Sequence, residues 1–454
     1  MIKRRNSLKM TDEELESYMQ ILIDSFSLEW LEKKNNHPIQ LLWERNDELS
    51  TSELYSLADA IKSLRDIDPD WVKSQVKLAK SRDKNNSRGA IFELLSLSMM
   101  NTPEHPVQPA KRNQAGYDGI ITKPEGQHTR VSIKSYGSSN FQQQFEKKAK
   151  EIEKTIIKLL KKYNYPPSQI ILDFPDIFPE KREWELLENR IDQIFNEQRN
   201  ATEPFTALAE TIDSSIPLEP GNSRAIFVLI INPFRHNTEV FHPAFNTYTL
   251  MISAKFHKNE HLNIFSKLND ACSNLSKHAA IETTEIINSL IIHIPDTISL
   301  KQCTDWLNQY FDEFPDKPIS FVILYQVSVA DDLTTKTSSI NHCVNIYTRK
   351  GKKIEGNYKF CIPVGSVSHI SSDIFIVAEF PDGTKERIPI ESKYYYQRGE
   401  HYMKMLSDGK GSYHGNIKRI GNGVHTNMVI EFPGQKQSAV LKGKFPPSDE
   451  LFIL

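Results

Sequence analysis

The feature of this sequence that most constrains its fold is a carboxylate inside an apolar helical pattern. Glu93 occurs in the run RGAIFELLSLSMM, where its apolar neighbours are Ile91, Phe92, Leu94, Leu95, Leu97 and Met99. Burying a carboxylate among such side chains costs several kcal/mol unless another group pairs with it. We therefore expect a cation or a hydrogen-bond donor to lie close to Glu93 in the fold.

Two short strands joined by a turn follow this helix. The segments DGIIT (118–122) and TRVSIK (129–134) flank the turn residues KPEG (123–126), a pattern typical of a hairpin. If the hairpin closes around Glu125, Asp118 lies opposite Ser132.

The alternation of side chains along the second strand predicts which functional groups lie close together. Because side chains alternate between the two faces of a strand, Ser132 and Lys134 share one face. We expect Asp118 and Lys134 to lie within a few ångströms of each other, with Glu93 packed onto that same face. Two carboxylates and an ammonium group at one point are the groups of a divalent-metal phosphodiesterase site.

The order of these residues resembles the PD-(D/E)xK (restriction-endonuclease-like) nuclease superfamily. The resemblance covers residues 85–165 and rests on a helix with Glu93, the segment GYDG at a strand start, and a hairpin partner that ends in Lys134. It implies a site in which Mg²⁺ or Mn²⁺ is held by Asp118, Glu93 and the main-chain carbonyl of Ile133. It also implies that Lys134 orients or deprotonates the attacking water. The implied catalytic set is Glu93, Asp118, Ser132 and Lys134.

One position departs from the family pattern. Ser132 stands where the family has its second acid. A subset of restriction endonucleases looks similar, and in that subset a glutamate on the following helix replaces the missing acid. Glu146, and after it Glu151, are the candidates for this role, and Glu93 is the other. A degenerate site that has lost activity stays open.

A literal match to the family signature occurs far along the chain, where Asp382 precedes Glu391 and Lys393. Asp382-Gly383 is a hairpin-turn dipeptide between two strand-like segments. An acid at that turn and Glu391 would be more than about 20 Å apart on a straight strand. We therefore favour the earlier site.

Composition limits the classes of protein that remain. The chain has 454 residues, 25% of them charged, and a net charge of −2, so any nucleic-acid surface must be local. Cys272, Cys303, Cys343 and Cys361 form no CxxC pair and are expected to be reduced and structural. No apolar run reaches the length of a membrane span, and the first residues lack the apolar region of a signal peptide. A cytoplasmic location is the expectation.

We predict an α/β (α+β) fold with three parts. Residues 1–84 are expected to form a helical N-terminal segment, with a capping box at Thr11. Residues 85–330 form the nuclease-like core with an insertion at about 168–285, and residues 331–454 form a β-rich C-terminal domain. Two alternatives stay open for the core: the segment 289–327 completes the sheet, or 225–231 is its next strand. His293, in an apolar strand, is expected to be a core histidine rather than a metal ligand.

Two segments are candidates for nucleic-acid binding. A helix expected at 140–163 carries many lysines, which fits either a phosphate-binding face or a solvated face paired with glutamates. The segment KYYYQRGEHY (393–402) mixes aromatic and basic residues, which fits base stacking but also a well-formed sheet. The candidate residues are Lys147, Lys150, Lys154, Tyr395, Arg398, Lys418 and Arg419.

These observations favour a metal-dependent endonuclease that hydrolyses phosphodiester bonds in DNA. Size and extra domains look similar to restriction or phage-defence (antiviral) nucleases, which is an analogy only. An RNA substrate, a homo-oligomer and a defence-system partner protein stay open. The alternative is a catalytically degenerate module of the same fold that binds nucleic acid or a partner protein.

Overall fold

The structure is a computed structural model of the chain. It describes residues 4–6, 8–33, 37–111, 116–124, 126–165, 168–201, 210–218, 223–231, 248–278, 286–295, 298–332, 337–351, 375–379, 385–389, 392–398, 401–407, 413–419, 425–428 and 453–454.

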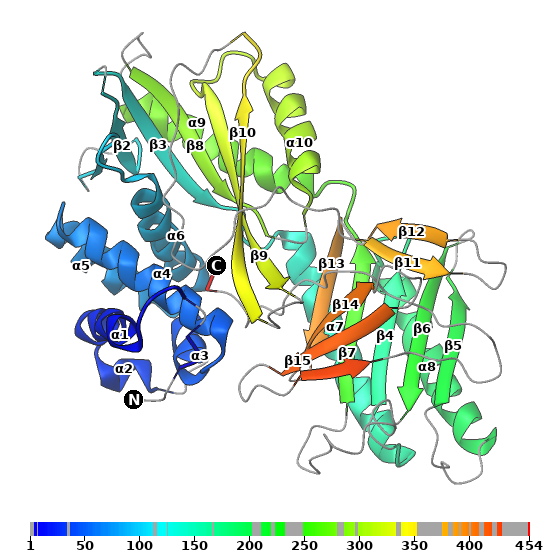
Figure 1. Cartoon of the computed structure of the whole chain (residues 1–454). Helices are drawn as coiled ribbons and strands as arrows, with labels where there is room; N and C mark the ends of the chain where they lie inside the picture. Colours follow the sequence, from blue (N-terminus) through cyan, green and yellow to red (C-terminus); the bar gives the residue numbers. More distant parts are fainter. Residues whose placement is uncertain are drawn as a thin grey trace. The chain divides into compact units, whose positions relative to one another are not determined.

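The chain divides into two compact units, and each is built from separate stretches of sequence. The first unit comprises Met1–Gly137, His261–Ser372 and Asp449–Leu454, and the second comprises Ser138–Glu260 and Asp373–Ser448. Helices and mixed sheets occur in both units (Figure 1), so the fold is α+β, as predicted. The division differs from the expected boundaries, because the N-terminal helices share a unit with the hairpin and the inserted segment starts at residue 138.

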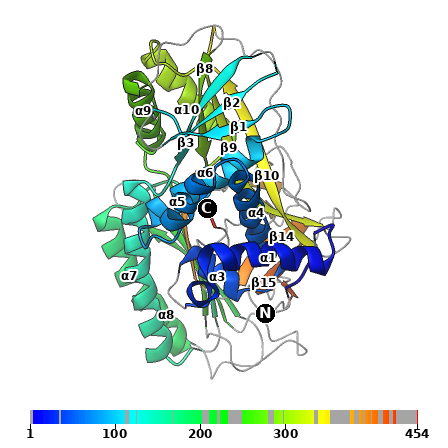
Figure 2. The same cartoon turned by 90° about the vertical axis from the view of Figure 1, so that its left-hand side faces the viewer.

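The first unit begins with a layer of helices (Figure 2). Their bounds are α1 Asp12–Phe26, α2 Leu28–Leu31, α3 Pro38–Glu44, α4 Glu48–Arg65, α5 Pro69–Ala79 and α6 Lys84–Met100. The capping box predicted at Thr11 is present, with Glu14 as its partner. The helix α4 is capped by Asp47, whose side chain accepts a hydrogen bond from the amide of Ser50.

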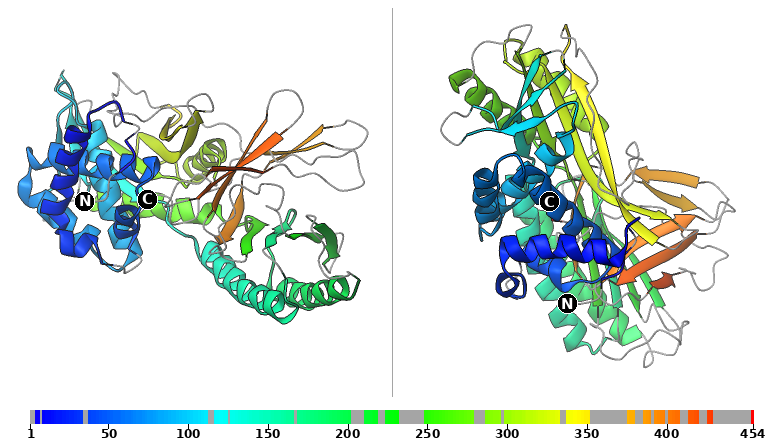
Figure 3. Two further views of the ribbon diagram at one scale, coloured as in Figure 1. Left: turned by 60° about the horizontal axis from the view of Figure 1, so that its bottom comes forward. Right: turned by 60° about the vertical axis from the view of Figure 1, so that its left-hand side comes forward.

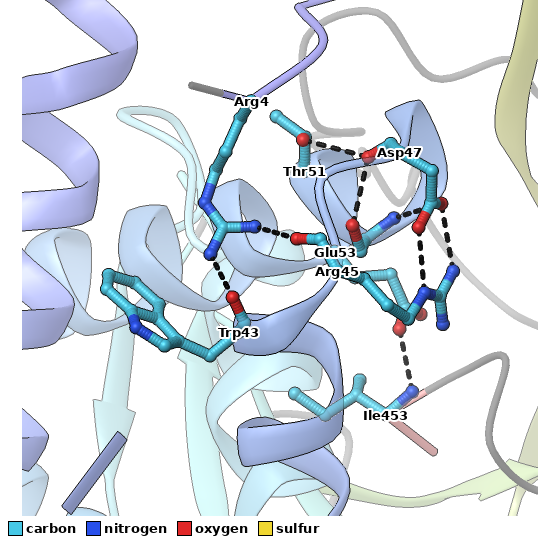
Figure 4. Close-up of polar contacts among 8 residues, drawn as sticks. Arg4, Trp43, Arg45, Asp47, Thr51, Glu53 and Ile453 are labelled. Atoms are coloured by element: carbon cyan, nitrogen blue, oxygen red, sulfur yellow. Dashed lines mark hydrogen bonds and ion pairs between the residues drawn. The ribbon is translucent and has the colours of Figure 1, made fainter. Parts of the chain in front are cut away.

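A buried polar network fixes the loop between α3 and α4, as Figure 4 shows. The guanidinium of Arg4 donates to the carbonyls of Trp43 and Arg45, each at 2.6 Å. Arg45 in turn forms a two-bond ion pair with Asp47, at 2.8 and 2.9 Å. Paired charges of this kind satisfy each other where water is excluded.

Glu53 of α4 is buried beside this network. It accepts a hydrogen bond of 2.7 Å from the amide of Ile453, which ties the last residues of the chain to α4 (Figure 4). Burial raises the pKa of Glu53 to about 8, although the hydrogen bond from Ile453 and the charge of Arg45 act against this. The Glu53 carboxyl is therefore neutral at neutral pH.

The sheet of the first unit has the strand order β1-β2-β3-β8-β9-β10. The strands are β1 Val107–Pro109, β2 Gly119–Thr122, β3 His128–Ser135, β8 Ile286–His293, β9 Phe321–Asp332 and β10 Thr337–Thr348. The predicted hairpin is the β2–β3 pair, while β3, β8 and β9 run parallel. The segment 289–327 therefore completes this sheet, and the alternative strand at 225–231 lies in the second unit.

Helices cover both faces of this sheet. On one face Phe92 of α6 stacks against Tyr325 and contacts His293. On the other face Phe311 of α10 (Leu300–Glu313) stacks against Tyr347, and α9 (His261–His278) packs near β3. His293 is buried, and burial lowers its pKa to about 3, so it is a core histidine, as predicted.

Gly119 allows α6 to approach the hairpin closely. A Cβ atom at this position would lie 2.7 Å from Cδ2 of Leu97, a side chain that is fully buried. This requirement for space explains why glycine follows Asp118 at the start of β2.

The second unit contains a five-stranded sheet in the order β13-β7-β4-β6-β5, with two long helices beside it (Figure 3). Its elements are α7 Asn140–Lys162, β4 Ser168–Phe174, α8 Lys181–Ala201, β5 Glu210–Pro217, β6 Arg224–Ile231, β7 Tyr248–Lys255 and β13 Lys393–Arg398. Its core is formed by apolar side chains of both helices, including Ile152, Ile156 and Leu187, and by the sheet.

The C-terminal part is rich in strands but does not form a single domain. β10 extends the first sheet and β13 extends the second, because their hydrogen-bond partners come from distant parts of the chain. The remaining strands, β11 Phe375–Glu379, β12 Lys385–Pro389, β14 His401–Ser407, β15 Tyr413–Arg419 and β16 His425–Met428, form two small sheets. The stretches 352–374 and 429–452 of this predicted β-rich part lie outside the described residues.

Two predictions from the composition, on the state of the cysteines and on membrane-spanning helices, can be compared with the described residues. Cys272, Cys303 and Cys343 are buried and free, whereas Cys361 lies outside the described part of the chain. Among the helices that the structure describes, none combines the length and apolar character needed to cross a bilayer.

The close approach at Gly119 predicts opposite effects for the same substitution at two glycines. Gly119→Ala should lower the free energy of unfolding by about 1–3 kcal/mol, because the added methyl overpacks the core against Leu97. Gly89→Ala is the matched control, since a Cβ there meets nothing within 4 Å, and it should stabilise α6 by about 0.5–1 kcal/mol. Urea unfolding measures both, and equal effects of the two changes would contradict this account.

The raised pKa of Glu53 predicts a loss of stability as the pH rises. The native state keeps a proton on Glu53 up to about pH 8, whereas the unfolded chain releases it near the ordinary pKa of glutamate. Stability is therefore fully present below the unfolded pKa and falls towards pH 8 by about 1.4 kcal/mol per pH unit. Glu53→Gln, which keeps an acceptor for Ile453, should flatten this slope in urea unfolding from about pH 5 to about pH 8. An unchanged slope would show that Glu53 is ionised in the native state.

Candidate active site

Asp118 lies directly before β2, at the end of the hairpin where β3 finishes. Its amide donates to the carbonyl of Val131 at 2.8 Å, and the next pair in the ladder is Gly119 with Val131. Continuing this register by one residue places Asp118 opposite Ser132, as the sequence analysis predicts.

The carboxylate of Asp118 lies against the edge of β3 beyond the start of β2. Its Oδ2 atom accepts a hydrogen bond of 2.5 Å from the amide of Ile133 and one of 3.4 Å from the hydroxyl of Ser132. Its Oδ1 atom has no hydrogen bond to any residue that the structure describes. One oxygen is thus fixed by the protein, and the other is available to a ligand.

Lys134 is the cationic member of the cluster. Its Nζ atom lies 3.9 Å from Oδ2 of Asp118, and the two side chains are 23% and 26% exposed. A partly solvated pair at this distance contributes little to stability, about 1 kcal/mol or less. The ammonium group is thus accessible to a bound molecule.

Glu93 lies on α6 and is largely buried, as the apolar pattern predicts. It accepts a hydrogen bond of 2.8 Å from Nε2 of Gln75 on α5. Burial raises the pKa of Glu93 to about 8, and the negative charge of Asp118 raises it further, whereas Lys134 and the hydrogen bond from Gln75 lower it. In the protein alone, Glu93 is therefore protonated at neutral pH.

The three charged groups meet across the edge of β3 rather than on one face of the sheet. Strand pairing puts Lys134 on the face opposite His293 and Tyr325, whereas α6 packs against those two residues through Phe92. The expectation that Glu93 shares a face with Lys134 is therefore wrong. The side chains of Glu93, Asp118 and Lys134 can approach one another because β2 begins only at Gly119. The end of β3 therefore has no paired strand on the hairpin side among the described residues.

The main-chain carbonyl of Ile133 points towards this open edge. In a strand, the amide and carbonyl of one residue point to the same neighbour, and the amide of Ile133 donates to Asp118. The carbonyl thus faces the side on which the Asp118 carboxylate lies. Carboxylate and carbonyl oxygens are the ligands that Mg²⁺ and Mn²⁺ prefer.

The sequence analysis missed Gln75. It lies on the buried stripe of α5 with Val72, Val76 and Ala79, so a polar residue in an apolar pattern was the available signal, as it was for Glu93. Its Oε1 atom is buried without a partner among the described residues. The two orientations of a side-chain amide have nearly the same shape. If the amide of Gln75 is flipped, its Oε1 atom can accept a hydrogen bond from the protonated carboxyl group of Glu93.

Of the candidates to replace the acid missing at Ser132, only Glu93 lies in the first unit. Among the described residues no group of three or more histidine, cysteine, aspartate or glutamate side chains could hold a metal ion. Glu146, the alternative ligand, belongs to α7 of the second unit, where it accepts a hydrogen bond from Gln142. The alternative Glu151, also on α7, pairs with Lys148 at 2.5 Å.

The residues predicted to bind nucleic acid all lie in the second unit. Lys147, Lys150 and Lys154 are exposed on α7, and Tyr395 is half-buried in β13. Arg398 belongs to β13, and Lys418 and Arg419 belong to β15. Their role stays a prediction.

The literal signature at residues 382–393 does not form a site among the described residues. Asp382 and Glu391 lie outside them. Lys393 is buried in β13, where its ammonium group contacts both carboxylate oxygens of Asp173 at 2.8 Å. This pair belongs to the core of the second unit.

The causes of the Glu93 shift predict how its pKa responds to substitution. Asp118→Asn should lower the pKa of Glu93 from about 8, because a neighbouring negative charge is removed. Gln75→Leu should raise it, since a hydrogen bond to the carboxylate is lost. Titration followed by ¹³C signals of the glutamate carboxyl groups measures both changes, with Glu93→Gln assigning the signal. Glu53 is the internal control, and an equal shift there would exclude a local cause.

Comparison of the chain with protein-family models, curated proteins and solved structures found no match. A functional assignment therefore depends on the geometry of Glu93, Asp118 and Lys134 and on the chemistry that these groups can perform.

Proposed function

We propose that the first unit is a Mg²⁺-dependent endonuclease with a restriction-endonuclease-like core, and that it hydrolyses phosphodiester bonds in DNA. The observation that carries this proposal is that the partly exposed Asp118 carboxylate lies 3.9 Å from Nζ of Lys134, within electrostatic reach of the buried Glu93. A carboxyl group whose pKa is raised by burial and by a neighbouring carboxylate is a candidate for a functional site where it lies beside an accessible charged pair.

A divalent cation fits the donor set. Asp118 offers Oδ1, Ile133 offers its main-chain carbonyl, and Glu93 offers a carboxylate once it loses its proton. A cation bound between the two carboxylates would remove their repulsion and keep Glu93 ionised. When bound, Mg²⁺ or Mn²⁺ would polarise the phosphate and lower the pKa of a bound water.

The surrounding residues have distinct roles in this proposal. The amide of Ile133 and the hydroxyl of Ser132 hold Asp118 in its ionised form, because both donate to Oδ2. Lys134 orients the attacking water and offsets the negative charge that develops on the phosphate. Gln75 keeps the Glu93 side chain directed at the site.

This arrangement makes activity depend on pH. Cation binding requires Glu93 without its proton, and its pKa is about 8 in the protein alone. Cleavage should therefore increase from neutral pH to about pH 8 and then level off, and a higher cation concentration should move this rise to lower pH.

The second candidate function is binding without cleavage. Ser132 in place of an acid favours it, because the site then has fewer carboxylates than the family pattern. A degenerate module would retain the fold and the affinity for nucleic acid or a partner protein. A role in phage defence and an RNA substrate are further predictions.

The test is cleavage of a supercoiled plasmid with Mg²⁺ or Mn²⁺, in parallel with a single-stranded RNA. We expect cleavage by the native protein and a loss of roughly a hundredfold or more in Asp118→Ala and Lys134→Ala. Glu93→Gln should lose activity and also the dependence on pH.

Glu53→Gln is the matched control, because Glu53 is also a buried glutamate of the first unit with a pKa of about 8, yet is not part of the cluster. It should cleave like the native protein. Equal activity in Asp118→Ala and the native protein would overturn the proposal. No cleavage under any condition, with DNA binding retained, would favour the second candidate.

A further inference from the structure

An aromatic pocket in the second unit is separate from the candidate active site. It has a volume of about 380 Å³ and is lined by residues of α7, of the segment before α8, and of the loop after β7. Phe141 and His257 stack with ring centroids 3.7 Å apart and an angle of 16° between the rings. Phe178 meets both rings edge-on, at 6.2 and 5.3 Å. All three are half-buried, so each ring is partly open to solvent.

Lysines outnumber acids among the residues that line this pocket, although Lys148 pairs with Glu151 and Lys181 pairs with Glu185. Lys147, Lys148 and Lys181 line it, against the two acids Glu151 and Glu180. Burial lowers the pKa of His257, as does the charge of Lys258, so its ring is neutral at neutral pH and can act as a stacking surface. The pocket thus combines flat aromatic rings with ammonium groups.

A stripe of lysines continues from the pocket along α7. Lys147, Lys150, Lys154, Lys158 and Lys161 follow one another at helical spacings of three and four residues, and all five are exposed. At 1.5 Å per residue the stripe is about 21 Å long. One strand of a duplex has a phosphate about every 3.4 Å, so the stripe can follow several phosphates.

Two other lysines of α7 are already paired. Lys148 pairs with Glu151 at 2.5 Å, and Lys162 pairs with Asp192 of α8 at 3.4 Å. None of the five stripe lysines has an ion-pair partner within 4.0 Å among the described residues. The carboxylate of Glu151 lies within electrostatic reach of Lys147 and Lys154, but no stripe lysine is held in a close ion pair with a described residue, so their ammonium groups are free to contact a ligand.

We propose that the second unit binds single-stranded nucleic acid, with one base stacked on Phe141, Phe178 and His257 and the following phosphates along the α7 lysine stripe. This inference goes beyond the proposed nuclease function, because it concerns the second unit and single-stranded nucleic acid. Aromatic rings beside a positively charged track are the two components that proteins use for single strands. A duplex does not offer a free base face to the pocket, and an acidic peptide lacks a base.

Fluorescence anisotropy with a labelled oligothymidylate of about 20 nucleotides tests this on the full chain. Excess EDTA is present, so binding is measured whether or not the protein cleaves DNA. Lys150→Gln/Lys154→Gln should weaken binding by about 20-fold at about 0.1 M salt and lower the slope of log K against log salt by about 1.4. Lys301→Gln/Lys350→Gln, at two exposed positions of the first unit, is the charge-matched control and should bind like the native protein.

The pocket is tested separately, because stacking does not depend on charge. Phe178→Ala should weaken binding of the single strand by about five- to a hundred-fold with an unchanged salt slope. Phe178→Tyr should restore binding, and a duplex of equal length should be unaffected by either change. Thermal unfolding of each variant shows whether the second unit is intact.

Three results would overturn the inference. One is equal affinity of the lysine variant and its control for the single strand. The second is an equal effect of Phe178→Ala on single strand and duplex. The third is competition by polyglutamate as effective as that by unlabelled DNA. Failure of plasmid cleavage alone would overturn the nuclease proposal and leave this binding site intact.

Discussion

The candidate active site of the first unit depends on a carboxyl group that the fold buries close to a second carboxylate. Glu93 is enclosed by α5 and α6 and lies within electrostatic reach of Asp118 and Lys134. Burial of Glu93 and the negative charge of Asp118 both favour the protonated form of Glu93. A cation bound between the two groups would favour the ionised form and complete the site. The open edge of β3 makes this possible, because the amide of Ile133 can bind the Asp118 carboxylate only where β2 has not yet begun.

The order of the elements along the chain explains how the unpaired end of β3 is preserved although each unit is built from separate stretches of sequence. The second unit enters the sequence between β3 and α9, after the last residue of the cluster, and the chain then returns to supply β8 as the parallel neighbour of β3 and β9 as the parallel neighbour of β8. β3 is therefore paired with a strand on both sides from His128 to Val131. From Ser132 onwards no described strand pairs with β3 on the hairpin side, and Ser132, Ile133 and Lys134 of the cluster lie there.

In both units, the proposed site contains side chains whose arrangement is unfavourable for the free energy of folding. In the first unit the cost is a buried carboxyl group near like charge. In the second it is a row of exposed lysines without close ion pairs among the described residues, beside half-exposed aromatic rings. Neither arrangement is needed to hold its sheet together, since the cores consist of apolar side chains such as those of Phe92 and Ile152. Ligands that supply the missing charge, a divalent cation in one case and phosphates in the other, would satisfy both.

The sequence by itself determined the local elements. The α6 helix, the β2–β3 hairpin with Asp118 opposite Ser132, the α7 helix and the capping box of α1 all follow from residue patterns within a few turns or strands. Glu93, as a carboxylate in an apolar helical pattern, predicted a nearby hydrogen-bond donor or cation. Only the tertiary structure decided that α6 covers the face opposite Lys134, that Gln75 is the donor to Glu93, and that β10 and β13 join different sheets. These features depend on strand pairing and packing between residues far apart in the chain. Local patterns do not determine them, because a strand with alternating apolar residues can pair with any of several other strands.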